Sequence, residues 1–148
     1  MLRIKDLLSD KGHDVWSVHP DQSVFQAIKI MAEREVGALV VRDDENKLIG
    51  IISERDYARK VILKGKASMQ TKVAEIMSRP VITVAEEARI DECMDLMTRR
   101  KIRHLPVLDR STLIGMISVG DIVKAIISEQ SFTITQLERY VRGEEAGS

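Results

Sequence analysis

Two aspartates, Asp56 and Asp121, each follow a serine by three positions, at the end of an apolar run that contains one glycine. An ionised carboxylate only accepts hydrogen bonds, and its two oxygens can take both adjacent hydroxyl donors of a ribose. Each aspartate is predicted to lie where a strand leads into a helix, an edge where α/β sheets bind ligands and where the helix start favours phosphate. The pattern predicts two half-sites for ribose-containing ligands, in which Ser53 and Ser118 cap the helix or add a contact.

The same Ser-x-x-Asp spacing has a structural interpretation that needs no ligand. Serine is a favoured N-cap residue, and an acidic residue three positions later completes a capping box. Many helices without a ligand begin in this way. The occurrence of the pattern at the same place in both halves favours ligand binding, but capping and binding can coexist, and both interpretations stay open.

An internal repeat relates the two halves of the chain. Ser17–Val18 aligns with Thr83–Val84 and, after a one-residue deletion in a hairpin turn, Gly50–Asp56 aligns with Gly115–Asp121. Two copies are too few for a solenoid, so they predict a closed pair related by a pseudo-twofold axis.

Each copy is predicted to be a β-α-β-β-α unit of an α+β protein. The helices are predicted from apolar residues at i, i+3, i+4 and i+7, and the strands from short apolar runs bounded by turns. The predicted elements are strand 15–18, helix 24–35, strands 36–41 and 48–53 and helix 54–63 in the first copy, then strand 81–84, a helix from 90, strands 102–108 and 113–118 and helix 121–129 in the second. Further helices are predicted within 1–12, at 73–77 and at 135–141.

We expect that neither unit has enough apolar surface for a core of its own. The two sheets are therefore expected to pack face to face, with the helices outside. The predicted division is a first repeat with its lead-in helix at 1–66, a second repeat with a linker helix at 67–130, and a C-terminal helix and tail at 131–148.

The composition argues against several classes of partner. The net charge of the 148 residues is zero and aromatic residues make up 3% of them, which disfavours binding to nucleic acid or to an anionic membrane. A single cysteine, Cys93, excludes an internal disulfide and fits a reducing compartment. No apolar run approaches the roughly 20 residues of a membrane span, and the N-terminus lacks the pattern of a signal peptide. A cytoplasmic protein is predicted, without nucleic-acid or membrane partners.

Residues for catalysis or metal binding do not form a recognisable pattern. The three histidines and Cys93 lack metal-ligand spacing, and no glycine-rich phosphate loop is present. Asp56 and Asp121 belong to separate sites, so they cannot act as an acid–base pair. The chain is therefore predicted to be neither an enzyme nor a holder of a metal or catalytic cofactor.

Taken together, the repeated strands, helix faces and Gly-to-Asp segments resemble a tandem CBS-domain pair over residues 1 to about 130. The matching stretches are Ser17–Val18, 81–84, the helix faces that end at Met31 and Met97, 102–107, Gly50–Asp56 and Gly115–Asp121. The resemblance implies a groove between the sheets that binds AMP, ADP, ATP, NAD or S-adenosylmethionine. In it the aspartate holds ribose, strand residues hold adenine, and basic residues hold phosphate.

The resemblance also implies which residues line the two sites. They are Ser17, Val18, Gly37, Ala38, Ser53, Arg55 and Asp56 in the first repeat, and Thr83, Ile102, Arg103, His104, Pro106, Met116, Ser118 and Asp121 in the second.

The two copies differ in their basic residues. The second has Arg103 and His104 where the first has Gly37 and Ala38, which have no side-chain donor. Arginine binds phosphate through two parallel hydrogen bonds, and a histidine beside phosphate gains charge. The site of Asp121 is therefore predicted to be the better phosphate binder, although Arg103 as a solvated surface charge and His104 as a half-buried strand residue are equally acceptable interpretations.

These features predict a stand-alone regulatory module. It would bind an adenosine nucleotide, sense the energy state, and signal to a regulated protein by a change of conformation or assembly. A homodimer is expected through helices 57–63 and 122–127, whose apolar stripes suit a helix–helix contact. The alternatives are a structural dimerisation module with degenerate sites and, least favoured, a small enzyme that acts on a nucleotide.

Overall fold

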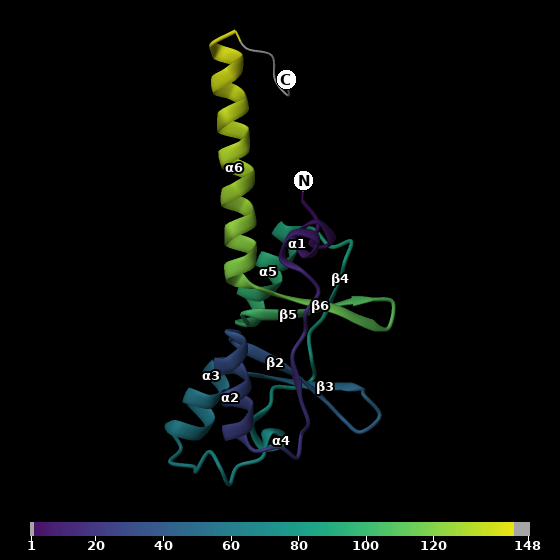
Figure 1. Cartoon of the computed structure of the whole chain (residues 1–148), viewed down its shortest axis with the longest axis vertical. Coiled ribbons are helices and arrows are strands. Elements are labelled where there is room, and N and C mark those ends of the chain that lie inside the picture. Colours follow the sequence, from purple (N-terminus) through teal and green to yellow (C-terminus); the bar gives the residue numbers. More distant parts are fainter. Residues whose placement is uncertain (1, 144–148) are drawn as a thin grey trace.

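Each half of the chain forms a three-stranded sheet in the computed structural model, which describes residues 2–143 (Figure 1). The first sheet has the order β1 (Ser17–Val18), β2 (Ala38–Arg42) and β3 (Leu48–Ser53). Strand β1 is parallel to β2, and β2 is antiparallel to β3. The first four residues of β2 are all buried, which is why this strand is a continuous apolar run rather than an alternating one.

The second sheet repeats this arrangement with β4 (Val84–Ala85), β5 (His104–Asp109) and β6 (Thr112–Ser118). The strand directions are the same, and each hairpin has a register shift at the equivalent place, after Val41 and after Val107. The repeat and the α+β class predicted from the sequence are therefore confirmed.

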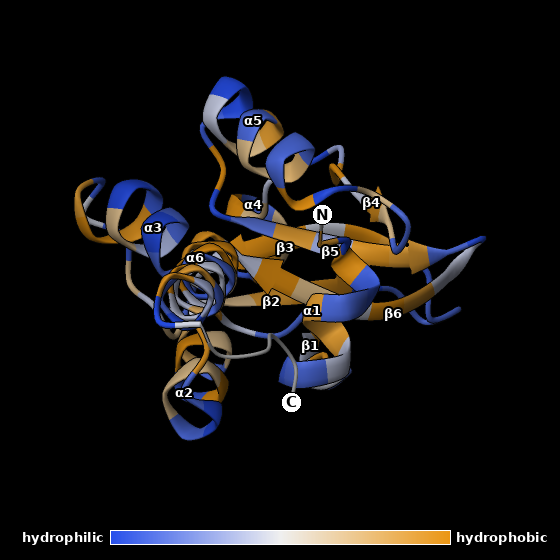
Figure 2. Ribbon diagram, turned by 90° about the horizontal axis from the view of Figure 1, so that it is seen from above, coloured by the Kyte–Doolittle hydropathy of each residue, from blue (hydrophilic) through white to orange (hydrophobic). Residues whose placement is uncertain are grey.

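The long helices of the two repeats are matched as well. Helix α2 (Val24–Arg34) and helix α5 (Ile90–Arg100) both end at a residue in the left-handed conformation, Glu35 and Lys101, each with φ of 55°. In both repeats one buried stripe of the helix covers the sheet, as the spacing predicted. Figure 2 shows the hydrophobic strands in the middle and the polar faces of the helices outside.

The helix that follows each sheet departs from the prediction. Helix α3 (Glu54–Tyr57) continues as a turn of π-helix, η1 (Ala58–Ile62), so the predicted extent is right but the hydrogen bonding changes. In the second repeat, α6 (Val119–Val141) is one helix of 23 residues, and the predicted interruption before 135 is wrong. The residues between 130 and 134 include no glycine or proline, and the Thr133 and Thr135 hydroxyls bond to carbonyls four residues back, at 3.1 and 3.0 Å.

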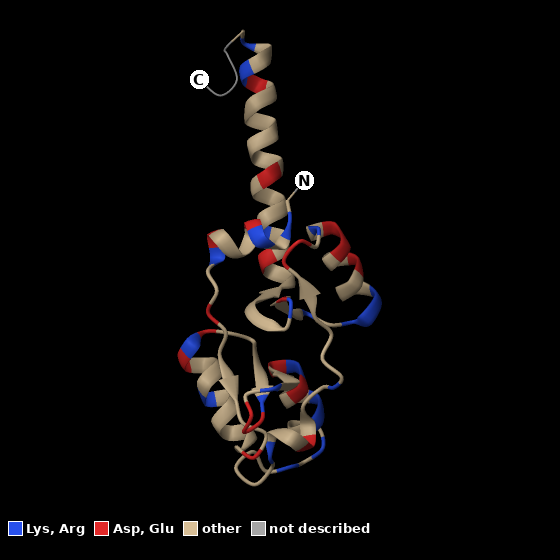
Figure 3. Ribbon diagram, turned by 90° about the vertical axis from the view of Figure 1, so that its right-hand side faces the viewer, with Lys and Arg blue, Asp and Glu red and all other residues tan. Residues whose placement is uncertain are grey.

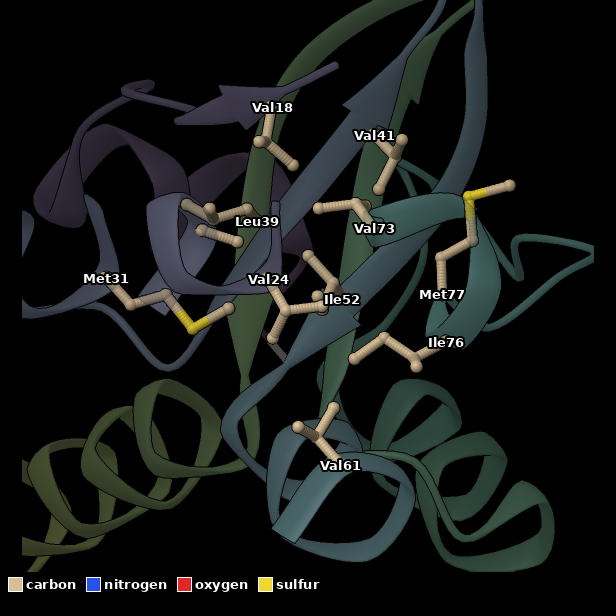
Figure 4. Packing of buried hydrophobic residues seen from close by; sticks show 11 residues of the cluster. Val18, Val24, Met31, Leu39, Val41, Ile52, Val61, Val73, Ile76 and Met77 are labelled. Carbon is tan, nitrogen blue, oxygen red and sulfur yellow. The ribbon is translucent and has the colours of Figure 1, made fainter. Parts of the chain in front are cut away.

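The short helices exchange places between the repeats. Helix α1 (Ile4–Lys11) joins the core of the second repeat, and α4 (Val73–Ile76) joins the core of the first (Figures 1 and 4). The lead-in helix assigned to the first repeat by sequence position thus packs with the second in space. The predicted tail, 144–148, lies outside the described residues.

Two strand glycines make this exchange possible. A Cβ at Gly50 would lie 2.5 Å from Sδ of Met77, and one at Gly115 would lie 2.7 Å from Cδ2 of Leu8. Any larger residue would therefore push the exchanged helix away from its sheet. The glycines of the repeated motif serve helix packing.

Candidate functional site

The carboxylate of Asp56 lies at the start of α3, with its side chain only 13% exposed. Its Oδ2 accepts hydrogen bonds from the backbone N–H and the hydroxyl of Ser53, both at 3.0 Å. Its Oδ1 accepts from the hydroxyl of Ser78 at 3.2 Å and pairs with Nζ of Lys60 at 3.0 Å. Both oxygens are thus fixed in place, and they retain acceptor capacity because a carboxylate has about four lone-pair sites.

Asp121 occupies the equivalent place at the start of α6, and its side chain is 25% exposed. Its Oδ2 accepts from the backbone N–H of Ser118 at 2.8 Å and from Nζ of Lys11 at 2.5 Å. Lys11 also donates to the carbonyl of Met116 at 2.6 Å, which anchors the end of α1 to β6. Burial by itself would raise the pKa of Asp121, but the hydrogen bonds from Lys11 and Ser118 outweigh it and hold the pKa below its usual value.

Both Ser-x-x-Asp segments form complete capping boxes. The serine hydroxyl accepts from the backbone N–H of the aspartate in each case, at 3.2 Å for Ser53 and 3.1 Å for Ser118. The structural interpretation of the motif is therefore confirmed. The role of the same carboxylates in ribose binding remains a prediction.

A cleft of about 340 Å³ surrounds Asp56 and is strongly basic. Its polar lining holds five Lys and Arg side chains against one carboxylate. The basic residues come from two places, the α3–η1 segment of the first repeat and the loop before β5 of the second. They are Arg55, Arg59, Lys60, Lys101 and Arg103.

The apolar part of this cleft is formed by residues from the same two repeats and from the segment that joins them. These residues are Ile51, Pro80, Ile82 and Ile102. An apolar wall beside a basic rim suits a ligand with an aromatic base at one end and phosphate at the other.

A second cleft, of about 270 Å³, surrounds Asp121 and has the opposite charge. It contains the carboxylates of Asp14, Glu35 and Asp121 and one cationic side chain, Lys11. The rest of its lining comes from the segment between α1 and β1, from the residues that follow α2, and from β5 and β6. These residues are Gly12, Val15, Trp16, Val36, Gly37, Ala38, His104, Met116 and Ser118.

The prediction that Arg103 lies beside Asp121 is wrong, because Arg103 lines the cleft of Asp56. Residues 102 and 103 of the second repeat join Asp56 of the first, whereas Gly37 and Ala38 of the first repeat join Asp121 of the second. Each cleft is therefore built from both repeats.

His104 is common to both clefts. Its ring lies against the first repeat, so that a Cβ at Gly37 would come within 3.4 Å of Nε2. Burial lowers the pKa of His104, as do the charges of Lys11 and Arg103, while Asp121 and Asp56 oppose them. The imidazole is therefore neutral near pH 7, with one N–H donor and one acceptor nitrogen.

Comparison with known proteins decides the family. The sequence pattern of the CBS domain matches residues 4–63 and 73–128, once in each repeat. The chain belongs to the CBS-domain family. It is 40% identical over 149 residues to the mitochondrial CBS domain-containing protein CBSX3 of Arabidopsis thaliana, covering 95% of this chain and 72% of that protein.

Solved CBS structures have the same fold. A CBS-domain containing protein from Agrobacterium tumefaciens is 39% identical, with a TM-score of 0.80 over 83% of this chain and 92% of its own. The CBS domain pair of protein MJ0100, crystallised with 5′-methylthioadenosine and S-adenosylmethionine, is 28% identical, with a TM-score of 0.77 over 87% of this chain and 98% of its own.

Four of the predicted site residues lie elsewhere in this CBS pair. Val18 is 3% exposed within the first core and Pro106 is also buried, so only their backbones could meet a ligand. Ser17 is exposed on β1. Thr83 lines a larger cavity of about 890 Å³ between the two hairpin tips.

Sequence reasoning missed basic residues that the fold adds to the clefts. Lys60 follows Asp56 by four residues, a spacing that favours an ion pair on a helix, so this contact could have been predicted. Lys11 gave no such signal, because it reaches Asp121 only through the exchange of α1.

Across residues 2–143, no group of three or more His, Cys, Asp and Glu residues is placed to hold a metal ion. In the same residues, no helix combines the length and apolar character of a membrane span.

Proposed function

We propose that this CBS pair is a regulatory module that binds adenosine-containing nucleotides in the clefts between its repeats. The candidates are AMP, ADP, ATP and NAD, and binding would signal to a regulated protein by a change of conformation or assembly. The observation that carries this proposal is the cleft of Asp56, where a fixed, largely buried carboxylate lies among five basic side chains. The carboxylate suits ribose, and the basic residues suit phosphate.

The Asp56 cleft is therefore proposed as the phosphate-binding site, in place of the Asp121 cleft favoured by the sequence. Arg55 and Arg103 enter it from different repeats, and Nη1 of Arg55 donates to the carbonyl of Lys101 at 3.1 Å. A phosphate held by both repeats would bring them together. This closure is the conformational change that we propose as the signal.

The Asp121 cleft is proposed to take an adenosine derivative with little negative charge. Its three carboxylates and single lysine repel phosphate but tolerate a neutral or cationic group. The adenosine compounds in the MJ0100 structure, 5′-methylthioadenosine and S-adenosylmethionine, are of this class. A ribose that bonds to Asp121 would compete there with Nζ of Lys11.

The chain is proposed to act as a homodimer in the cytoplasm and not as an enzyme. The surface proposed for the dimer includes Ile62 and Leu63 after α3, which are 56% and 77% exposed, and Val123 and Ile127 of α6, which are 42% and 56% exposed. Apolar side chains at these positions suit a helix–helix contact.

Titration calorimetry with adenosine, AMP, ATP, NAD and S-adenosylmethionine tests the proposal. Asp56→Ala should abolish the site for AMP and ATP, and Asp121→Ala should abolish the site for adenosine or S-adenosylmethionine. Each variant also loses part of a capping box, at a cost of about 1 kcal/mol, so its folding is checked by thermal unfolding.

Arg103→Met gives the sharper test of the phosphate site. Loss of a hydrogen bond to a charged group costs about 1.5–3 kcal/mol, so ATP should bind roughly 10- to 100-fold more weakly while adenosine binding changes little. Arg99→Met is the matched control, because Arg99 is exposed, lines neither cleft and pairs with Asp95 at 2.9 Å.

A structural dimerisation module is the second candidate, and the capping boxes favour it because they explain both aspartates without a ligand. It predicts flat titrations with all five compounds. That result would refute nucleotide binding and leave the dimer as the function.

A further inference from the structure

Helix α6 extends well beyond the body of the protein (Figure 1). Ile122 near its start is fully buried, and the first turns pack against α1 and α5. From Ile127 onward, nearly every residue is exposed. Figure 3 shows that few residues of this projecting part are charged.

The exposed residues of α6 include a stripe of large apolar side chains. Ile127 and Ile134 are 56% exposed, Leu137 is 60% exposed and Val141 is 83% exposed. An isolated helix of this length is marginal in water, and exposed apolar residues along one side of it need a partner.

The spacing of this stripe is that of a coiled coil. Along the stripe, the spacing between successive residues alternates between four and three. The residues are Val123, Ile127, Gln130, Ile134, Leu137 and Val141. These are the d and a positions of a heptad repeat, with β-branched residues at all three a positions. β-branched residues at a favour two parallel strands when leucine occupies d, and here one of the three d positions, Leu137, is a leucine.

We propose that α6 pairs with α6 of a second copy of this chain, in a parallel two-stranded coiled coil along these six positions. The stripe begins at Val123 and Ile127, which also belong to the dimer surface of the proposed function, so the coiled coil extends that surface beyond the body. A parallel arrangement places the two bodies side by side at the same end of the coiled coil.

The residues beside the stripe are compatible with this pairing. The flanking g positions hold Ile126, Thr133 and Tyr140, so no like charges oppose each other across the contact. Gln130 meets its own copy in a parallel pair, where two amides can hydrogen-bond to each other and fix the register. The packing of the first turns on α1 and α5 supplies a helical nucleus, from which the projecting turns can extend and pair.

Disulfide formation tests the pairing and its direction. Leu137→Cys places two thiols opposite each other in the parallel coiled coil, and mild oxidation should give a covalent dimer. In an antiparallel pair Leu137 would face Ile127, about 15 Å from its own copy, which is too far for a disulfide. Thr135→Cys is the control, because Thr135 is exposed but lies outside the stripe, so its thiols should not form a disulfide between the two chains. Cys93 is buried and does not compete.

Sedimentation of the double variant Ile134→Asp/Leu137→Asp gives a second readout. Both residues are exposed in the single chain, so the fold should be kept, and the dissociation constant of the dimer should rise at least tenfold. Absence of the Leu137→Cys disulfide, equal cross-linking of Thr135→Cys, or an unchanged dissociation constant would each overturn the coiled coil. The proposed nucleotide sites are judged separately, since AMP binding at Asp56 involves none of these residues.

Discussion

Replacement of Lys11 by methionine should have opposite effects on stability and on ligand binding. Lys11 holds Oδ2 of Asp121 at 2.5 Å and the carbonyl of Met116 at 2.6 Å. A hydrogen bond to a charged group contributes about 1.5–3 kcal/mol when shielded from water. The lysine side chain is 37% exposed, so solvent screening reduces this, and we expect a loss of about 1 kcal/mol at pH 7.

The pH dependence of this loss has a definite sign. The pKa of Asp121 is below its usual value in the folded chain, so its contribution is complete above the unfolded pKa of about 3.9 and falls away as the pH drops further. Urea unfolding of wild type and Lys11→Met should therefore differ equally at pH 7 and pH 5, and the difference should shrink near pH 3.

The same substitution frees the carboxylate for a ribose. Calorimetry should find that adenosine binds several-fold more tightly to Lys11→Met than to wild type, because the ligand no longer competes with the lysine. Lys5→Met, on an exposed position of the same helix, should change neither stability nor affinity. Weaker adenosine binding in Lys11→Met, or no loss of stability, would refute the reasoning.

Two further predictions concern packing and thiol chemistry. Gly50→Ala should destabilise the fold by about 1–3 kcal/mol in urea unfolding, because its methyl group would overlap Met77, whereas Gly120→Ala, whose Cβ would come no closer than 3.6 Å to its neighbours, should be neutral or stabilising. Burial, and then the charges of Glu92 and Asp91, raise the pKa of the Cys93 thiol to about 11, so a thiol reagent at pH 8 should label Cys93 only after unfolding. Rapid labelling of the native protein would contradict this.

Much of the fold could be predicted because the features of each repeat depend on residues that are close together in the sequence. The capping serines, the helix spacing and the hairpins each depend on a few neighbouring residues, and all appear twice. The continuity of α6 through residues 130–134 was not predictable from the same patterns. Polar and β-branched residues are weak helix formers, which is why the sequence predicted a break there. The helix nevertheless continues, and the Thr133 and Thr135 hydroxyls bond to carbonyls of the preceding turn.

The composition of the clefts was harder to predict, for a reason of symmetry. Alignment of the repeats identifies equivalent residues, such as Gly37 and Arg103, but a pseudo-twofold axis places equivalents in different clefts. The positive charge of Arg103, which was predicted to lie beside Asp121, therefore lies in the cleft of Asp56. No local pattern predicts which residues share a cleft, because that depends on how the two repeats of the chain pack together.

The position of each aspartate links its cleft to the surface proposed for assembly. Asp121 is the third residue of α6, whose exposed stripe begins at Val123, and Asp56 is the third residue of α3, which leads through η1 to the exposed Ile62 and Leu63. A ligand that replaces Lys11 on Asp121, or draws Arg103 toward Asp56, would thus act on the first turn of a helix that is also proposed to meet the second copy. The affinity for the ligand and the affinity for the second copy must then change by the same factor, because coupling between two sites is reciprocal.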